Sequence, residues 1–255
     1  MMTLDRRRAV RGMMALTGAS LVRAPRAATV LDDVIGRHVA ARGGAAALDR
    51  VTQCRIKLDI TERGQTIQGN YAADIAGLVR IDIRVEGKLV YREGVDRKGV
   101  WLWPDGEAQP KDSTATGAAN ALLHGIEGNL VGLHRYASRG NRLSLMPEEL
   151  IDGVRYQVVE VKYKTGHVSY LYIDPVTSMI ARKRDERAYH PDVDQTKARV
   201  ESRYLDFKTV DGIVSSDRNE DFDLRTGKLL SVNQVTAREW NPGIAAEVFE
   251  RTYAP

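Results

Sequence analysis

The feature that most constrains this chain is a two-residue alternation of apolar and polar side chains through residues 52–103. Three consecutive segments share it. Their apolar members are Cys54, Ile56, Leu58 and Ile60, then Ile67, Tyr71, Ala73 and Ile75, then Val79, Ile81, Ile83 and Val85. Because successive side chains on a strand point to opposite faces, the pattern predicts an antiparallel sheet with one wet face and one apolar face.

The remainder of the chain repeats short apolar segments between turn signals such as Asp152-Gly153, Asp174-Pro175 and Asp211-Gly212. We count about eleven strands at this short spacing, which predicts one large antiparallel sheet curled toward a barrel. No domain linker is visible, so residues 29–255 are expected to form a single domain. The charged stretch 182–197 is expected to be an exposed loop or the end of a hairpin.

Two helical regions are expected beside the strands. Apolar residues at helical spacing predict a helix from Val30 to Val39, ended by Gly43-Gly44, with a short helix after it, packed on the apolar side of the sheet. A second apolar stripe recurs at intervals of three and four in an insertion, and it consists of Ala119, Leu122, Leu123, Ile126, Leu130 and Leu133. Its glycines favour two short helices over one. The insertion is either a movable cover or fixed core.

The first 28 residues resemble an export signal. Arg6-Arg7-Arg8 is followed by a modestly apolar stretch and by small residues up to Ala28, as in twin-arginine signals. These residues also hold six of the 38 basic residues and one of the 34 acidic ones, so the rest is near neutrality and has no bulk tendency to bind nucleic acid. The only cysteine, Cys54, lies far past the leader. We therefore expect cleavage, a soluble periplasmic product without a lipid anchor, and Cys54 as a buried apolar residue.

Motifs for catalysis, metals or cofactors are absent from the sequence. The five histidines show no tight ligand spacing, and His38 fits the apolar stripe of the first helix as a packed residue. The segment 190–194 is more simply a solvated acidic loop than a cation site. No nucleophile elbow and no phosphate-binding loop occurs. We therefore expect no cofactor, no metal and no enzymatic activity, although an enzyme with dispersed site residues stays open.

Several short motifs, taken in order, resemble the LolA/LolB-like family of periplasmic lipoprotein carriers. They are Ala41-Arg42-Gly43-Gly44 to Leu48, Gly99-Val100-Trp101, the run 152–158, Tyr172-Ile173-Asp174 with Thr177, Tyr204-Leu205-Asp206-Phe207 before Val210-Asp211-Gly212, and Phe249. The resemblance spans about residues 30–250. It implies a mainly β (α+β) fold, an incomplete antiparallel β-barrel whose concave apolar face is covered by the N-terminal helix and the helical insertion.

The resemblance also implies a function, which is to carry lipoprotein acyl chains or another lipid-like ligand in the concavity. The lining would comprise Ile56, Leu58, Ile60, Tyr71, Ile81, Ile83, Tyr91 and Trp101, and the lid Leu122, Leu123, Ile126 and Leu130. Trp101 is either a ligand contact or part of the barrel wall. A membrane-bound donor or acceptor protein is an expected partner, and the carrier is expected to be monomeric. The alternative is a periplasmic sensor domain of the same fold that binds lipid or a partner peptide.

Overall fold

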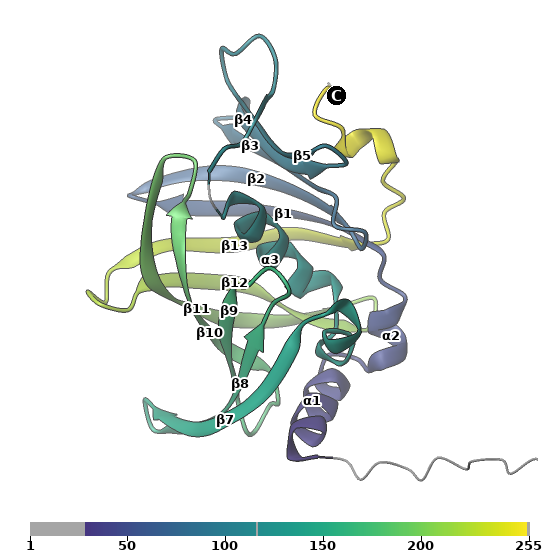
Figure 1. Ribbon diagram of the computed structural model, residues 1–255, viewed down its shortest axis with the longest axis vertical. Coiled ribbons are helices and arrows are strands. Elements are labelled where there is room, and N and C mark those ends of the chain that lie inside the picture. The colour runs from purple at the N-terminus through teal and green to yellow at the C-terminus, as the bar shows by residue number, and fades with distance from the viewer. Residues whose placement is uncertain (1–28, 116, 254–255) are drawn as a thin grey trace, which may run out of the picture.

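The computed structural model contains one antiparallel sheet of thirteen strands. The structure describes residues 29–115 and 117–253, apart from the side chains at 121 and 124–127. The strand order is β6-β5-β4-β3-β2-β1-β13-β12-β11-β10-β9-β8-β7. The strands are β1 Gln53–Glu62, β2 Gln65–Asp74, β3 Val79–Val85, β4 Lys88–Asp96, β5 Gly99–Pro104, β6 Lys111–Asp112, β7 Arg142–Ile151, β8 Val154–Lys162, β9 Val168–Ile173, β10 Ile180–His190, β11 Asp194–Val210, β12 Ile213–Asp223 and β13 Leu229–Trp240. The sheet curls without pairing β6 to β7 (Figure 1). The predicted incomplete barrel is therefore confirmed.

The strands differ from the prediction in two places, once in number and once in length. A two-residue strand, β6, lies between β5 and the helical insertion and adds to the count. The charged stretch 182–197 is mostly strand, because β10 and β11 run to the hairpin tip at residues 191–193. Ion pairs across this ladder, such as Arg184 with Glu201, allow charged residues to occupy strand positions. The hairpin tip reaches back to β1, where His190 Nε2 lies 3.0 Å from Glu62 Oε1.

The helices follow the predicted regions with one correction. α1 (Val30–Ala41) begins with a capping box formed by Thr29 and Asp32, and α2 (Ala45–Asp49) follows. The insertion is one helix, α3 (Ala118–Leu130), followed by the 3₁₀ turns η1 (Leu133–Arg135) and η2 (Ala137–Arg139), so the expected pair of short helices is wrong. Packing on the sheet outweighs the helix-weakening effect of Gly125 and Gly128. None of the helices in the described part of the chain is long and apolar enough to span a membrane.

The concave face of the sheet carries the main apolar core. α3 contacts β2, β3, β4 and β5, whereas α1 contacts η1 and β7 near the other edge of the sheet. Side chains from both helices, including Val34 and Leu122, join one buried cluster with strand residues such as Ile56 and Val159. The helices therefore cover the apolar side of the sheet, as the alternation predicted.

Two residue-level predictions within this core are confirmed. Cys54 is fully buried on the concave face, and burial raises the pKa of its thiol to about 12. His38 lies on the buried face of α1, with Nδ1 2.9 Å from the carbonyl oxygen of Ser178. Burial lowers the pKa of His38 to about 4, so this histidine is neutral at physiological pH.

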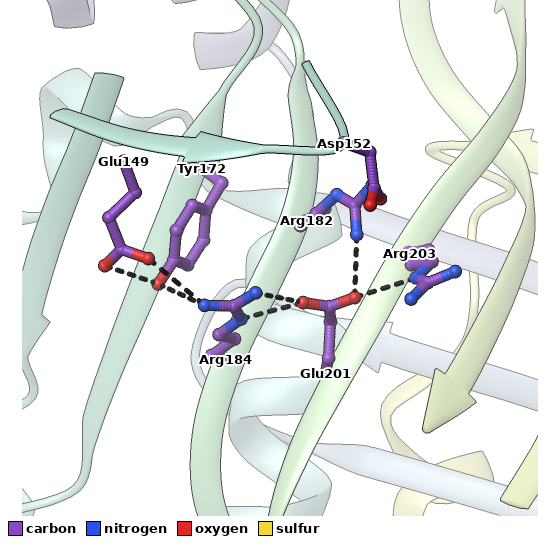
Figure 2. A network of polar contacts seen from close by, with 7 residues as sticks. All are labelled: Glu149, Asp152, Tyr172, Arg182, Arg184, Glu201 and Arg203. Atoms are coloured by element: carbon purple, nitrogen blue, oxygen red, sulfur yellow. Dashed lines mark hydrogen bonds and ion pairs between the residues drawn. The ribbon is translucent and has the colours of Figure 1, made fainter. Parts of the chain in front are cut away.

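The opposite, convex face carries a charged network on β9, β10 and β11. Glu201 lies at its centre and accepts hydrogen bonds from Arg182 Nη1 at 2.9 Å, Arg184 Nε at 2.7 Å and Arg203 Nε at 2.7 Å (Figure 2). Arg184 also donates to Glu149 at 3.2 Å. Burial alone would raise the pKa of Glu201, but the arginine hydrogen bonds outweigh it and lower that pKa.

Removing Glu201 should therefore destabilise the fold. Glu201→Ala leaves three arginines without their shared carboxylate, and we expect a loss of about 2 kcal/mol in the free energy of unfolding at pH 7, below the full cost of breaking a buried pair because the arginines are partly exposed. The loss should shrink in acid, because protonation of Glu201 removes the same pairing in the wild type. Urea unfolding measures this, with the exposed Glu186→Ala of the neighbouring strand β10 as control. Equal unfolding free energies for the two variants would contradict the assignment.

Candidate ligand-binding site

The structure places most of the predicted lining residues on one face of β1–β4. Ile56, Leu58, Ile60 and Ile81 are buried in the main core, and Tyr71 and Ile83 pack against it partly exposed. The strand register explains why these residues share one face, since Ile56 pairs with Tyr71 and Tyr71 pairs with Ile81. Tyr91 pairs with Ile83 and so lies on the same face.

Trp101 is the exception, and its predicted place in the lining is wrong. Its ladder partner is Gly94, which pairs in turn with Arg80, and all three lie on the convex face. A Cβ at Gly94 would lie 2.9 Å from the Trp101 ring, so the indole lies directly over this glycine. The Arg80 guanidinium is 6.0 Å from the ring centroid and donates to Val248 O, in the C-terminal segment that contains η3 (Ala246–Phe249). Trp101 is therefore barrel wall.

The predicted lid residues lie on α3 above the concave face. Leu122 and Leu130 are buried in the main core, and Leu123 packs against it partly exposed. The side chain of Ile126 lies outside the described residues. Three of the four positions are therefore seen to face the sheet.

A cavity of about 540 Å³ lies between α3 and one end of the half-barrel. Its apolar lining comes from α3 and the strands, and its rim from the turns β2–β3, β4–β5 and β8–β9. The apolar members are Ala73, Ile75, Ala76, Leu78, Val79, Val95, Leu123, Leu130 and Val131. Its volume falls within the range of about 300–1,000 Å³ typical of small-molecule sites. This cavity, called the α3 cavity below, joins residues from both ends of the strand order.

A second hollow of about 880 Å³ lies between α1, η1 and the start of β7, and it is more open to solvent. Leu31, Ile35, Val39 and Leu143 contribute apolar surface to it. Because this groove lies along the outer edge of α1 and not beneath the predicted lid, we take the α3 cavity as the candidate site.

Glu93 is a concave-face residue that the sequence analysis missed. It pairs with the buried Ile81 and so points to the apolar side, where the hydroxyl of Tyr91 lies 3.5 Å from Oε2. Burial, followed by repulsion from Asp192 on the β10–β11 hairpin, raises the pKa of Glu93 to about 7. The signal was present in the sequence, because Glu93 is in phase with Tyr91 and Val95 on an alternating strand.

A charged wall on β10–β13 also departs from the expected oily concave face. Ladder pairs run from the core residue Leu171 through Lys183, Ser202 and Asp221 to Ser231, which places this row on the concave side. Ser202 donates to Asp221 at 2.6 Å, and Arg187 pairs with both Asp221 and Asp185. Burial disfavours charge on Asp185, but Lys183 and the other cations outweigh it and lower the pKa of this carboxyl.

These charges balance within the wall, so it needs no bound ion. Among the described residues, no group of three histidine, cysteine, aspartate or glutamate side chains is arranged to hold a metal. The concave face thus has one apolar half, under α3, and one half in which charged groups are paired with each other.

The raised pKa of Glu93 should appear in the stability of the protein. Between about pH 4.5 and 7 the folded chain holds more protons at this site than the unfolded chain, so the free energy of unfolding falls as pH rises, and it stays lower above pH 7. Glu93→Gln should therefore raise the free energy of unfolding by about 1–3 kcal/mol at pH 8 and change it little at pH 4. Urea titrations at both pH values test this, with the exposed Glu148→Gln as control. A gain at pH 4 as large as that at pH 8 would refute the assignment.

Comparison with known proteins finds relatives by structure only. No protein-family model matches the sequence. No curated protein matches it either. Among solved structures, the chain is similar to a LolA superfamily protein from Nitrosomonas europaea, with a TM-score of 0.58 and 13% identity over 89% of this chain and 100% of that one. It is also similar to a DUF1329 family protein from Desulfovibrio piger, with a TM-score of 0.56 and 13% identity over 87% of this chain and 98% of that one.

At this identity the likeness concerns the fold, and it covers nearly the whole described chain. The open thirteen-stranded sheet, the helix packed on its concave face and the cavity beneath that helix agree with the architecture that the sequence motifs implied. The chain therefore folds as an open half-barrel that is similar to the LolA superfamily protein.

Proposed function

We propose that this protein is a non-catalytic carrier for a lipid-like ligand, such as the acyl chains of a lipoprotein, held in the α3 cavity. The observation that supports the proposal most directly is the cavity itself, because apolar side chains line a space large enough for a ligand beneath a helix that forms one of its walls. The LolA-like fold supports the same function. The arginine-rich residues 1–28, which lie outside the described part of the chain, support export to the periplasm.

Burial of hydrocarbon supplies the binding energy in this proposal. Each methylene moved from water into an apolar site contributes about 0.8 kcal/mol, so a dozen methylenes contribute about 10 kcal/mol. Association costs about 4–15 kcal/mol of translational and rotational freedom, so only the surplus appears as affinity and a longer tail should bind more tightly. No specific polar contact is needed, which agrees with the lack of a catalytic motif.

The contacts of α3 indicate how the lid would move. Its C-terminal end is tied to the body, because Arg42 Nη1 donates to Gly128 O at 3.4 Å and Arg238 Nη1 donates to Asn129 Oδ1 at 3.2 Å. Its N-terminal end follows Gly117, whose φ of +90° suits a glycine turn at the end of the preceding loop. We therefore infer that the lid opens at its N-terminal end about a hinge near Gly128, and that ligand binding offsets the free energy of opening.

A charge placed under the lid should abolish binding. Leu123 lines the α3 cavity, so Leu123→Arg puts a guanidinium in the apolar space and should weaken binding of the neutral fluorophore N-phenyl-1-naphthylamine at least about tenfold. Fluorescence titration of the protein after removal of bound lipid measures the affinity. Thermal unfolding confirms that the variant is folded.

The matched control is Leu150→Arg, the same change at an exposed position on edge strand β7. It should bind the fluorophore as the wild type does.

Native mass spectrometry of protein purified from the periplasm should also show co-purifying acyl species in the wild type and their loss in Leu123→Arg. Unchanged binding in a folded Leu123→Arg protein would refute the α3 cavity as the site.

A further inference from the structure

The rim of the α3 cavity carries charged side chains of both signs. They are Asp74, Asp96, Arg97, Arg139 and Lys164, and they come from the end of β2, the end of β4, the β4–β5 turn, η2 and the β8–β9 turn. Whether this rim attracts anions or cations depends on which charges are already paired within the protein.

Both carboxylates of the rim are engaged. Asp96 accepts two hydrogen bonds from Arg251, at 2.7 and 2.9 Å, and two from the backbone N–H groups of Lys98 and Gly99. The hydrogen bond from Arg251 is the main reason that the pKa of Asp96 is lowered. Asp74 Oδ1 accepts the N–H of Ala76 at 2.6 Å and so closes the β2–β3 turn. Asp96 is thus neutralised by Arg251, and Asp74 is the one carboxylate of this set that keeps its charge, against the three cations Arg97, Arg139 and Lys164.

Two of the cations have no such partner. Among the residues that the structure describes, no carboxylate pairs with the exposed side chains of Arg97 or Lys164. Lys164 is fixed at its backbone, where the N–H donates to Asn141 Oδ1 at 3.1 Å, and its side chain passes over Gly140. Arg139 already donates to the carbonyl of Ile75 across the rim. The unneutralised charge at the opening is therefore positive.

These observations fit one class of ligand. An apolar cavity with unpaired cations at its opening matches an amphiphile whose tail enters the cavity and whose anionic head stays at the rim, where arginine and lysine bind carboxylate or phosphate. We propose that the α3 cavity selects single-chain amphiphiles with an anionic head group, held by Arg97 and Lys164. The inference rests on the proposed carrier function and names the chemistry of its ligand.

Binding of a matched set of twelve-carbon ligands tests the head-group preference. Dodecanoate, dodecyl phosphate, dodecanol and dodecylamine share one tail and differ in charge, and displacement of N-phenyl-1-naphthylamine at pH 8 and low salt gives the affinity of each. The wild type should bind the two anions at least about fivefold more tightly than dodecanol, and dodecylamine most weakly. The ratio of dodecanoate to dodecyl phosphate then distinguishes a carboxylate from a phosphate head. Salt should reduce the preference, because it screens exposed charges.

The double variant Arg97→Gln/Lys164→Gln should lose the preference for anions and keep the affinity for dodecanol. The control Arg225→Gln/Lys228→Gln removes the same charge at the exposed β12–β13 turn and should bind all four ligands as the wild type does. An anion preference retained in the double variant, or equal affinity of the wild type for dodecylamine and dodecanoate, overturns the head-group inference while the carrier function stands. Failure of the wild type to bind any of the four ligands overturns both.

Discussion

The structure depends on the burial of one face of a sheet that never closes on itself. A closed barrel hides its interior by its own curvature, but here β6 and β7 remain unpaired edges and the concave face needs separate elements to cover it. α3 covers β2–β5, and α1 with η1 covers the region near β7. A gap in this cover is therefore a natural place for a ligand, and the α3 cavity is such a gap.

The two faces of the sheet use charge differently. On the concave side, the wall on β10–β13 pairs Asp185 and Asp221 with cations inside the barrel, whereas the apolar half under α3 contains the isolated carboxyl of Glu93. On the convex side, arginines pair with Glu201 across β10 and β11, and Arg184 extends the network to Tyr172 on β9 (Figure 2). Paired charges can stay buried at tolerable cost, and an unpaired one shifts its pKa instead. This division leaves one half of the interior apolar, which is where the proposed ligand would lie.

The core face could be predicted from local pattern, but of the predicted lining and lid residues that the structure describes only Leu123 and Leu130 line the α3 cavity. Alternation placed Ile56, Leu58, Ile60 and Ile81 on the core face, and helical spacing placed Leu122 and Leu130 on the face of α3 that meets them. Trp101 was misplaced although its phase was readable, because Val95 and Val100 are the inward pair of that hairpin and Trp101 is out of phase with them. The prediction for Trp101 rested on its aromatic character and not on its position in the strand alternation. The C-terminal segment that covers Trp101 and Arg80 is distant in sequence and gave no signal.

The sequence by itself determined the mainly β class, the two helical regions, the core face of β1–β4, and the buried, unreactive states of Cys54 and His38, because each follows from periodicity or from neighbours along the chain. Only the tertiary structure decided that α3 is one helix, that β10 and β11 continue through a charged stretch, and that turns from both ends of the strand order meet at one cavity rim. The charge state of that rim was equally invisible, since Asp96 is neutralised by Arg251, 155 residues away in the chain. Pairings over such separations are set by how the sheet curls, and a one-dimensional pattern does not contain that curvature.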